Sequence, residues 1–429
     1  MPDSDKFGVL EYRSDGVMKK TSNSPVLQRS TAPAFIRPGK IFMITQHQIY
    51  FQNSRSMEAL ASESVDLVVT SPPYPMIEMW DAMFVVQNPE IDNAIGKGDG
   101  PVAFELMHRE LDAVWQEVWR VLKPSGIASI NVGDATRTIN SRFRLYPNHA
   151  RILNQFLKLG FEALPAIIWR KQTNAPNKFM GSGMLPPSAY VTLEHEYILI
   201  LRKGPKREFN REPEKQNRRQ SAFFWEERNA WFSDVWMDVK GTVQHLCDRA
   251  ARLRSAAFPF EVPYRLINMF SVKGDAVVDP FLGIGTTMWA AMTAGRNFVG
   301  YEIEKGLRNE IYGIADSIVG YANQRIDRRI QTHVDYVKQN QRPKGGFNYK
   351  NAYYNFPVKT RQETQILLNP LMTIQTIGNN SFKVAYSDKP HRLWVTDKHK
   401  PDNPQAKSSS PQKKTSPKKK RRSVQRNLW

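Results

Sequence analysis

Cysteine is almost absent from this chain: among 429 residues there is one, Cys247. A single cysteine cannot form an internal disulfide, and it cannot supply the set of thiolates that structural zinc sites use. Long apolar runs are missing too. Nothing approaches the roughly 18 apolar residues that a membrane-spanning helix needs, and residues 1–40 hold no continuous apolar stretch like that of a signal peptide. These absences predict a cytoplasmic protein without a membrane anchor.

Metal-site spacing is also missing, and acidic residues are comparatively few. The eight histidines show no paired spacing, so no metal is expected, and His195 between two glutamates is interpreted as structural. The formal net charge is +20, and residues 398–429 hold eleven Lys or Arg against one acid. This tail is nearly free of apolar residues, which predicts disorder. Its charge indicates attraction to nucleic acid, with plain solubility as the alternative.

Strand-like and helix-like segments alternate along much of the chain, which predicts a doubly wound, mostly parallel α/β sheet. The expected strands are 65–70, 127–132, 163–169, 196–201, 276–278 and 297–303, and the expected helices are 104–122, 150–159 and 286–294. A short helix is expected at 57–61. The polar, glycine-rich stretch 87–101 is expected to be irregular and mobile.

Two of the apolar runs lead directly into loops of unusual chemistry. Val65–Thr70 runs into Ser71-Pro72-Pro73-Tyr74, and 276–278 runs into Asp-Pro-Phe-Leu-Gly-Ile-Gly-Thr-Thr over 279–287. Ligands of open α/β sheets bind beyond the carboxyl ends of the strands. Both loops are therefore expected to line one crevice.

The Ser-Pro-Pro-Tyr loop predicts recognition of a planar ring that carries an amino group. Two successive prolines lack N–H groups, so the loop presents carbonyl acceptors, which complement the donor hydrogens of an exocyclic amine. Tyr74 offers an aromatic face, and stacking a base on it is worth about 1–3 kcal/mol. That offsets part of the cost of extruding a base from a duplex. The alternative is that the prolines merely stiffen a loop.

The glycine-containing loop predicts a cofactor site. Gly283 and Gly285 let the backbone approach a ligand, while Asp279 would repel a pyrophosphate and suits a cofactor that carries an ammonium and a sulfonium. Glu302, at the end of the next strand, is placed to accept hydrogen bonds from ribose hydroxyls. A purely structural strand–turn–helix is the alternative. Together the two loops favour a methyltransferase that acts on a nucleic-acid base.

These residues resemble the amino-methyltransferases of bacterial type II restriction–modification systems, specifically the permuted β-type that methylates cytosine N4. In that family the Ser-Pro-Pro-Tyr motif precedes the Asp-Pro-Phe-x-Gly-x-Gly-Thr-Thr motif. The resemblance covers Met57 to about Asp316. It implies a Rossmann-like, seven-stranded sheet, S-adenosyl-L-methionine as cofactor, and double-stranded DNA as partner. It also implies pairing with a cognate restriction endonuclease, and a monomer or weak dimer is expected.

The resemblance also assigns site residues. The catalytic residues it implies are Ser71, Pro72, Pro73 and Tyr74, and the cofactor-binding residues are Thr70, Phe258, Pro259, Asp279, Pro280, Phe281, Gly283, Gly285, Thr286, Thr287 and Glu302. Asn53 departs from the family, because many relatives carry an acid there.

The implied reaction is base flipping followed by methyl transfer to cytosine N4, without a covalent enzyme intermediate. Ser71 would bond near the ring nitrogen and the amino group, and the Ser71 and Pro72 carbonyls would accept amino hydrogens. Methylation of carbon 5 needs a thiolate that usually follows a proline, and Cys247 follows a leucine, so that route is rejected. Adenine N6 remains an alternative target, although relatives that act on adenine mostly have Asp or Asn in place of Ser71. A non-catalytic DNA-binding regulator on the same scaffold is a further alternative.

The chain is predicted to divide into a flexible arm (1–40), a catalytic half (41–170), a target-recognition insert that contains strand 196–201 (171–257), a cofactor-binding half (258–330), a C-terminal module (331–397) and the basic tail (398–429). The insert carries seven basic and three acidic residues over 203–219, followed by an aromatic cluster at 223–232. This segment is interpreted either as a DNA-reading element or as a solvated loop beside an aromatic satellite core. The candidate DNA-binding residues are Lys203, Lys206, Arg207, Arg211, Arg218 and Arg219.

Overall fold

The computed structural model describes residues 41–171, 181–240, 258–313, 315, 317–340 and 347–391. The predicted arm (1–40), the basic tail (398–429) and Cys247 lie outside the described residues. Among the helices of the described part, none combines the length and apolar character needed to cross a membrane.

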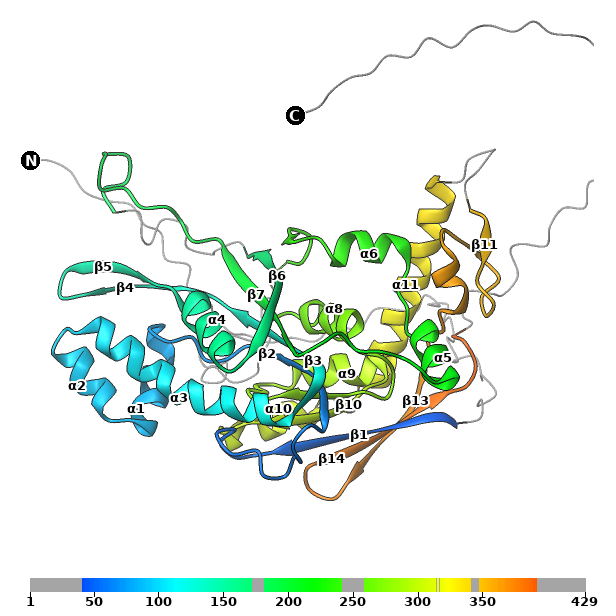
Figure 1. Cartoon of the computed structure of the whole chain (residues 1–429), viewed down its shortest axis with the longest axis horizontal. Helices are drawn as coiled ribbons and strands as arrows, with labels where there is room; N and C mark the ends of the chain where they lie inside the picture. The colour runs from blue at the N-terminus through cyan, green and yellow to red at the C-terminus, as the bar shows by residue number, and fades with distance from the viewer. Residues whose placement is uncertain are drawn as a thin grey trace, which may run out of the picture. The chain divides into compact units, whose positions relative to one another are not determined.

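A ten-stranded sheet runs through the described part of the chain (Figure 1). In spatial order its strands are β13 (Leu371–Ile377), β14 (Ser381–Ser387), β1 (Ile41–Tyr50), β10 (Asn297–Tyr301), β9 (Ala276–Asp279), β2 (Val65–Thr70), β3 (Leu122–Val132), β7 (His195–Lys203), β6 (Phe161–Arg170) and β8 (Val235–Trp236). The five strands from β1 to β3 are parallel to one another, and β7 and β14 run antiparallel to their neighbours. The predicted mostly parallel sheet is confirmed, with β8, β13 and β14 added at its edges.

Helices cover both faces of this sheet because its central strands are apolar on both sides. In β2, Leu67 and Val69 pack into one core cluster, whereas Val65 and Val68 pack into another. The first cluster contains residues of α8 (Glu261–Phe270), α9 (Thr286–Ala294) and α11 (Ile318–Asn340), and the second contains residues of α3 (Gly100–Val121) and α4 (Asn148–Lys158). This is the pattern of a parallel sheet buried between two helical layers.

The remaining described elements are shorter. They are the helices α1 (Asp81–Gln87), α2 (Glu90–Gly96), α5 (Glu212–Gln220), α6 (Trp225–Trp231) and α10 (Arg308–Gly313), the 3₁₀ turns Glu78–Trp80, Lys305–Leu307 and Arg361–Gln365, and the two-stranded pairs β4–β5 (Ala135–Ile139 and Arg142–Tyr146) and β11–β12 (Tyr349–Lys350 and Pro357–Val358).

The prediction of an irregular stretch at 87–101 is wrong. Most of it is helical, because Ile91 and Ala94 lie three residues apart and pack together into the core. Gly98 adopts a positive φ in the turn that follows, and the Asp99 side chain then caps α3 by accepting from the Val102 amide at 3.2 Å. The glycines and polar residues here end one helix and begin another.

The short helix predicted at 57–61 is also wrong. This segment forms turns that the side chains of α3 hold in place. Glu117 accepts a hydrogen bond from the Met57 amide at 2.6 Å, and Arg120 donates to the Met57 and Leu60 carbonyls. Long-range hydrogen bonds replace helical ones in this case.

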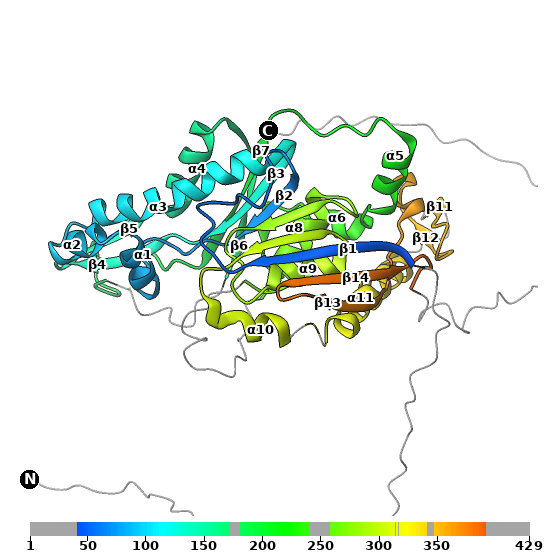
Figure 2. The ribbon, with the colours of Figure 1, turned by 90° about the horizontal axis from the view of Figure 1, so that it is seen from below.

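Part of the aromatic stretch at 223–232 forms a satellite core, whereas Trp225 and Phe232 are exposed. The stretch contains α6, and Phe224 is fully buried against Ile326 and Ile330 of α11. The basic stretch before it, 203–219, contains the helix α5. The predicted C-terminal module contributes β13 and β14 to the main sheet, where β14 pairs with β1 (Figure 2).

Candidate active site

The two motif loops leave adjacent strands at the same edge of the sheet. β2 and β9 are parallel neighbours, with Leu67 opposite Val277 and Val68 opposite Val278. One hydrogen bond joins the ends of the two strands directly, since Thr70 Oγ1 donates to Asp279 Oδ1 at 2.5 Å. The loops therefore begin side by side, and both line one cavity of about 500 Å³.

Most of the residues assigned from the resemblance line this cavity. They are Ser71, Pro72, Pro73, Tyr74, Phe258, Asp279, Pro280, Phe281, Gly283, Thr286, Thr287 and Glu302. Three others support the site without lining it. Thr70 bonds Asp279, the carbonyl of Pro259 accepts from the Val262 amide at the start of α8, and Gly285 takes the left-handed backbone from which α9 begins.

Asp279 holds the glycine-containing loop (279–287) in place through hydrogen bonds. Its carboxylate is 1% exposed and accepts from the Thr70 and Thr287 hydroxyls and from the Phe281 amide. Burial raises the pKa of Asp279 to about 6, although these three donors favour its charged form. The sequence predicted direct charge complementarity to a cofactor, but the oxygens of this carboxylate already bind the protein. Its field still reaches the cavity that it lines.

Glu302 shapes the glycine turn from the opposite side. One carboxylate oxygen accepts from the Gly283 amide at 2.7 Å and the other accepts from the Glu304 amide at 2.8 Å. Burial raises the pKa of Glu302 to about 7. A carboxylate oxygen has more lone pairs than one amide uses, so Glu302 keeps acceptor capacity toward the cavity.

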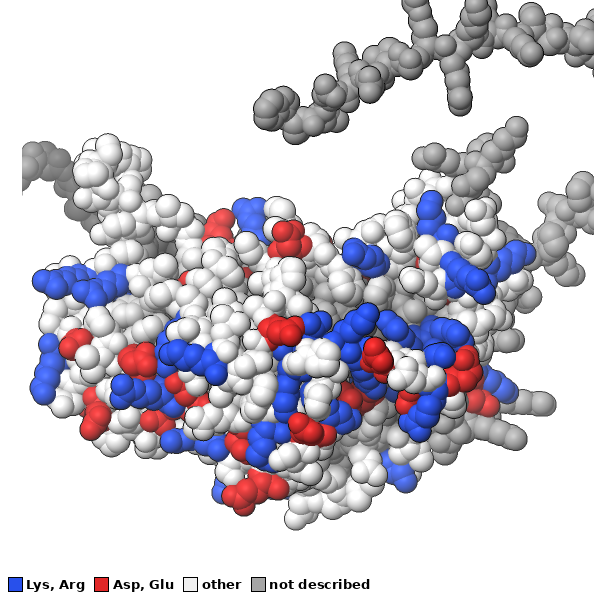
Figure 3. Space-filling model, in the orientation of Figure 1, with Lys and Arg blue, Asp and Glu red and all other residues white. Residues whose placement is uncertain are grey.

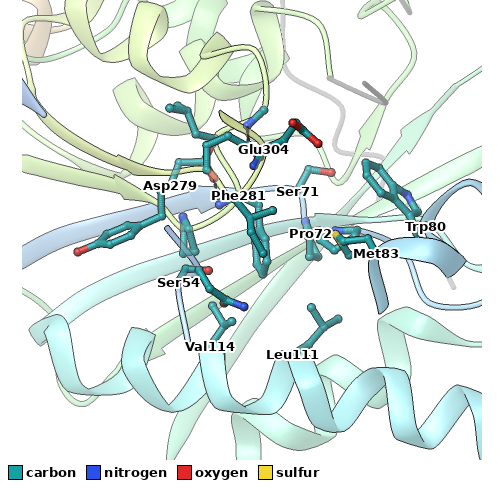
Figure 4. A pocket seen from close by; sticks show the side chains of 18 of the residues that line it. Ser54, Ser71, Pro72, Trp80, Met83, Leu111, Val114, Asp279, Phe281 and Glu304 are labelled. Atoms are coloured by element: carbon teal, nitrogen blue, oxygen red, sulfur yellow. Dashed lines mark hydrogen bonds between the residues drawn. The ribbon is translucent and has the colours of Figure 1, made fainter. Parts of the chain in front are cut away.

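The opposite wall comes from helices that the motifs do not include. Leu111 and Val114 of α3 lie across from Phe281, and Ser71 and Pro72 lie beside it (Figure 4). Trp80 and Met83, from the segment around α1, close another side, as do residues of the turn after β1. The helical spacing of Leu111 and Val114 was visible in the sequence. It indicated a core face, and only the fold shows that this face also meets the cavity.

Asn53 also belongs to the cavity wall. Its amide donates to Gln87 Oε1 at 3.0 Å, and its carbonyl oxygen accepts from the Arg55 amide. The position where many members of the resembled family carry an acid is therefore neutral here and is tied to α1. A charged cofactor group near this wall would meet a dipole rather than a carboxylate.

A partly buried polar network lies behind the Ser-Pro-Pro-Tyr loop. Tyr74 Oη donates to Glu196 Oε2 at 3.0 Å, and the Asn131 amide donates to the same Glu196 oxygen at 2.7 Å and to Tyr74 Oη at 3.0 Å. Lys171 Nζ donates to the other Glu196 oxygen at 2.7 Å. Burial, reinforced by the Glu196 carboxylate, raises the pKa of Tyr74 well above its ordinary value. The phenol therefore stays protonated and remains a donor.

This network fixes the direction of the Ser71 hydrogen bond. Ser71 Oγ lies 3.0 Å from Tyr74 Oη, and the one phenolic hydrogen already goes to Glu196. The Ser71 hydroxyl therefore donates to Tyr74, and its oxygen accepts from the Asn131 amide at 3.4 Å, which leaves one lone pair as an acceptor for a ligand. Asn131, Glu196 and Lys171 were missed by sequence reasoning, since their convergence depends on the antiparallel pairing of β3 with β7.

Two of the predicted DNA-binding residues are engaged in structural contacts. Lys203 is buried, and its ammonium donates to the carbonyls of Trp119 and Leu122 at 2.9 and 2.8 Å. Arg207 forms a two-pronged ion pair with Asp275, with nitrogen–oxygen distances of 2.6 and 3.0 Å. Their charges therefore also compensate protein groups, and their role in DNA binding stays a prediction.

The other four lie on α5 or in the segment before it. This part of the chain is at the opposite end of the strands from the two motif loops. Asn217 of α5 donates to the Lys273 carbonyl, just before β9, whereas the cofactor loop follows β9. Arg211 and Arg219 pair with glutamates of α5, Arg218 lies against the Phe209 ring, and Lys206 is exposed. The basic stretch does not converge with the cavity.

Among the described residues, Glu226, His333 and Glu363 are grouped closely enough to hold a metal ion. Most of their ligand atoms already have protein partners, although Glu226 Oε2 is buried without one in the described part of the chain. The two ring nitrogens of His333 bond Glu226 and the Pro357 carbonyl, and Glu363 accepts from the Trp225 and Thr360 amides. This group packs α6 against α11 and does not line the cavity.

A family model described as DNA methylase matches residues 65–313, from the strand before the serine loop to α10. The chain belongs to the N6/N4 DNA methylase family. It is therefore a DNA methyltransferase, and the matched segment contains both motif loops and the network around Glu196.

Individual relatives agree with this family. The type II methyltransferase M.MthZI of Methanothermobacter thermautotrophicus is 51% identical over 347 residues, which is 81% of this chain and 96% of the relative. M.MjaI of Methanocaldococcus jannaschii is 49% identical over 294 residues, which is 65% of this chain and 95% of the relative. A putative DNA modification methylase of Thermus thermophilus, crystallised with S-adenosyl-L-methionine, superposes with a TM-score of 0.50 at 31% identity, covering 63% of this chain and 96% of that protein.

Proposed function

We propose that this DNA methyltransferase flips a cytosine out of a specific double-stranded sequence and methylates its exocyclic N4. The observation that carries the proposal is the Ser71 hydroxyl, which donates to Tyr74, accepts from Asn131 and keeps one acceptor lone pair for the cavity that it lines. An exocyclic amine is a donor through both of its hydrogens, and an acceptor at Ser71 complements it.

S-adenosyl-L-methionine is the cofactor, and the cavity suits it. A volume of about 500 Å³ is in the range of small-molecule sites, and apolar walls formed by Phe281, Leu282 and Ile303 suit an adenine ring. Glu302 retains acceptor capacity for ribose hydroxyls, and the buried Asp279 supplies negative charge near the glycine turn. The cofactor contributes an electrophilic methyl group bound to a sulfonium.

The residues of this chain contribute orientation and electrostatics. The amino lone pair of cytosine is delocalised into the ring, so the amine is a weak nucleophile. Accepting its hydrogens at Ser71 and at the Ser71 and Pro72 carbonyls favours a tetrahedral nitrogen with its lone pair directed at the methyl carbon. Transfer forms a nitrogen–carbon bond and breaks a carbon–sulfur bond, whose electron pair stays on sulfur. The amino nitrogen then loses one proton.

Cytosine is preferred to adenine because of residue 71. In the resembled family, enzymes that act on adenine mostly carry Asp or Asn at this position, and this chain carries Ser. The order of the two motifs, catalytic before cofactor-binding, is that of the permuted β-type. The names of M.MthZI and M.MjaI as type II methyltransferases support a role in protecting DNA from a cognate restriction endonuclease.

The test is the identity of the methylated nucleoside. Plasmid DNA is incubated with the purified full-length protein and S-adenosyl-L-methionine labelled in its methyl group, then digested to nucleosides that are separated and identified by mass. The proposal predicts label in N4-methylcytosine and strongly reduced label with Ser71→Ala. Label in N6-methyladenine would reassign the base. Binding of DNA without any transfer would favour the non-catalytic regulator.

A further inference from the structure

A loop between β6 and β7 carries an exposed apolar tip. Met184 is 87% exposed and Leu185 is 71% exposed, and Val191 farther along the loop is 95% exposed. The tip is nevertheless ordered by backbone contacts, because Gly181 pairs with Ala189 in an isolated bridge and the Ser182 amide donates to the Ser188 carbonyl at 3.0 Å. Adjacent large apolar side chains held out in solvent commonly mark an interaction surface.

The base of this loop is bonded to the catalytic network. The Lys171 amide donates to the Glu194 carbonyl at 2.9 Å, which closes the base. The Lys171 ammonium then reaches Glu196, which holds Tyr74. Since β7 runs antiparallel to β3, its first residues lie at the same edge of the sheet as the serine loop. The loop therefore begins at the carboxyl ends of the parallel strands, where a target base must enter the cavity.

A basic hairpin stands beside the loop. Phe143, in the β4–β5 hairpin, stacks on Tyr190 with ring centroids 4.3 Å apart and an interplanar angle of 9°. Arg142 and Arg144, on either side of Phe143, are both exposed. Figure 1 shows the loop before β7 rising next to the hairpin, and Figure 3 shows basic side chains on this side of the molecule below an uncharged tip. The stacking of Phe143 on Tyr190 thus holds the loop with the apolar tip beside the hairpin that carries the two arginines.

We propose that the loop Gly181–Val191 and the β4–β5 hairpin form a DNA-binding arm. Its tip, Met184 and Leu185, enters a groove of the duplex, and Arg142 and Arg144 contact backbone phosphates. This proposal rests on the proposed function, because it assumes that duplex DNA lies across the cavity mouth. Methionine and leucine are among the side chains that other DNA-binding proteins insert between base steps, and arginines on either side complement the charge of the backbone.

The two parts of the arm have different signatures in DNA binding. Apolar contacts with bases release no counterions, so removing them lowers affinity without changing the salt dependence. Each phosphate contact contributes about −0.9 to the slope of log affinity against log salt concentration. Removing both arginines should therefore flatten the slope by about 1.8 as well as lowering affinity.

The experiment measures equilibrium binding of a fluorescent duplex, cut from the plasmid DNA that serves in the transfer assay, over a range of salt concentrations. Three double variants of the full-length protein are compared: Met184→Ser/Leu185→Ser, Arg142→Gln/Arg144→Gln, and the control Leu157→Ser/Ile377→Ser. The control changes two exposed apolar residues of α4 and β13, which are 47% and 50% exposed. Binding of S-adenosyl-L-methionine, measured by calorimetry, reports folding of each variant.

The proposed DNA-binding arm is supported if two results are found together. The tip variant binds the duplex at least tenfold more weakly with an unchanged salt slope, and the arginine variant shows the flatter slope. The proposal is overturned if the tip variant binds like the control, or if its loss of affinity appears only as a changed slope. Methyl transfer by the wild type is measured in parallel. DNA binding without transfer contradicts the proposed function and leaves the arm to be judged by the binding data alone.

Discussion

At the scale of single residues, Tyr74 has a ring at the cavity and a hydroxyl in the network behind it, and two substitutions separate these parts. Tyr74→Ala removes both, so turnover should fall at least tenfold, because base stacking on an aromatic side chain is worth about 1–3 kcal/mol. Tyr74→Phe keeps the ring and removes the bonds to Ser71, Asn131 and Glu196, so its turnover should fall less. Steady-state kinetics of methyl transfer to unmethylated plasmid DNA measures this. Cofactor affinity serves as the control and should change little, and normal turnover in Tyr74→Ala would refute a stacking role.

The raised pKa of Glu302 leads us to expect that the affinity for the cofactor depends on pH. Burial raises its pKa to about 7, so the folded protein holds this carboxyl protonated at lower pH and charged at higher pH. The charged form is the better acceptor for ribose hydroxyls. The affinity of the wild type should therefore rise by roughly tenfold between about pH 6 and pH 8, since one pKa unit corresponds to a tenfold change.

The matched control for this prediction is Glu302→Gln, which cannot titrate. At high pH the Glu302→Gln variant should bind the cofactor more weakly than the wild type does. It should also lack the part of the pH dependence that comes from titration of Glu302. Asp279 and the cofactor's own amine titrate in both proteins, so the difference between them isolates Glu302. Calorimetry across the pH range provides both curves, and two curves of the same shape would show that Glu302 does not contact the bound cofactor.

At this scale the sequence revealed the two motif loops that line one side of the cavity, but neither the opposite wall nor the residues that support the loops. The serine and glycine loops were recognisable because each is a contiguous motif whose chemistry follows from its own residues. Glu196 lies 122 positions from Tyr74 along the chain, and neither it nor Lys171 carries a local signal. The protein contacts of Lys203 and Arg207 were not predictable, because a run of basic residues does not reveal which of them pair with buried carbonyls or carboxylates.

At the scale of elements, one ion pair joins α6 to α11. The guanidinium of Arg329 contacts Glu227 at 2.6 and 2.7 Å with both side chains buried, and it also lies over the Trp231 ring. Arg329→Met would leave the Glu227 charge buried without its partner. We expect the free energy of unfolding to fall by about 3–5 kcal/mol.

Arg328, the residue before Arg329 in α11, is exposed and gives a matched control. Arg328→Met should change the free energy of unfolding by no more than about 0.5 kcal/mol. Urea unfolding followed by tryptophan fluorescence compares the two variants. Equal effects would show that the ion pair does not stabilise the packing of α6 on α11.

Helices whose apolar residues recur at regular helical spacing were predictable from the sequence. Segments held in place by contacts with distant residues were not. The helices over 104–122, 150–159 and 286–294 were expected from apolar spacing and are present as α3, α4 and α9. The segment around Met57 was expected to be helical, but hydrogen bonds from Glu117 and Arg120 hold it in turns. In α2 the helix was missed because glycines around it outweighed the two apolar residues that anchor it.

At the scale of the whole molecule, the basic tail predicts a long-range electrostatic contribution to DNA binding. Residues 398–429 carry eleven Lys or Arg and one acid. Deleting them should flatten the salt dependence of DNA affinity by about 0.9 for each phosphate that the tail neutralises, without changing the sequence that is methylated. A full-length protein with the eleven basic residues changed to glutamine controls for chain length and should match the deletion. A slope like that of the wild type would place the tail away from DNA.

The assembly of the sheet was only partly predictable at this scale. Alternating strands and helices predicted a parallel sheet with helices on both faces, since that pattern leaves few other arrangements. Nothing in the periodicity indicated that β14 would pair with β1, at the other end of the described chain, because antiparallel edge pairing depends on the complete fold.

The central claim is that the serine loop and the glycine turn meet around one cofactor and one base. The most direct measurement is a crystal structure of the full-length protein with S-adenosylhomocysteine. We expect the ribose hydroxyls at Glu302, the adenine between apolar walls beside Phe281, and the sulfur directed at Ser71. A cofactor bound outside this cavity, or one whose sulfur points away from Ser71, would contradict the account.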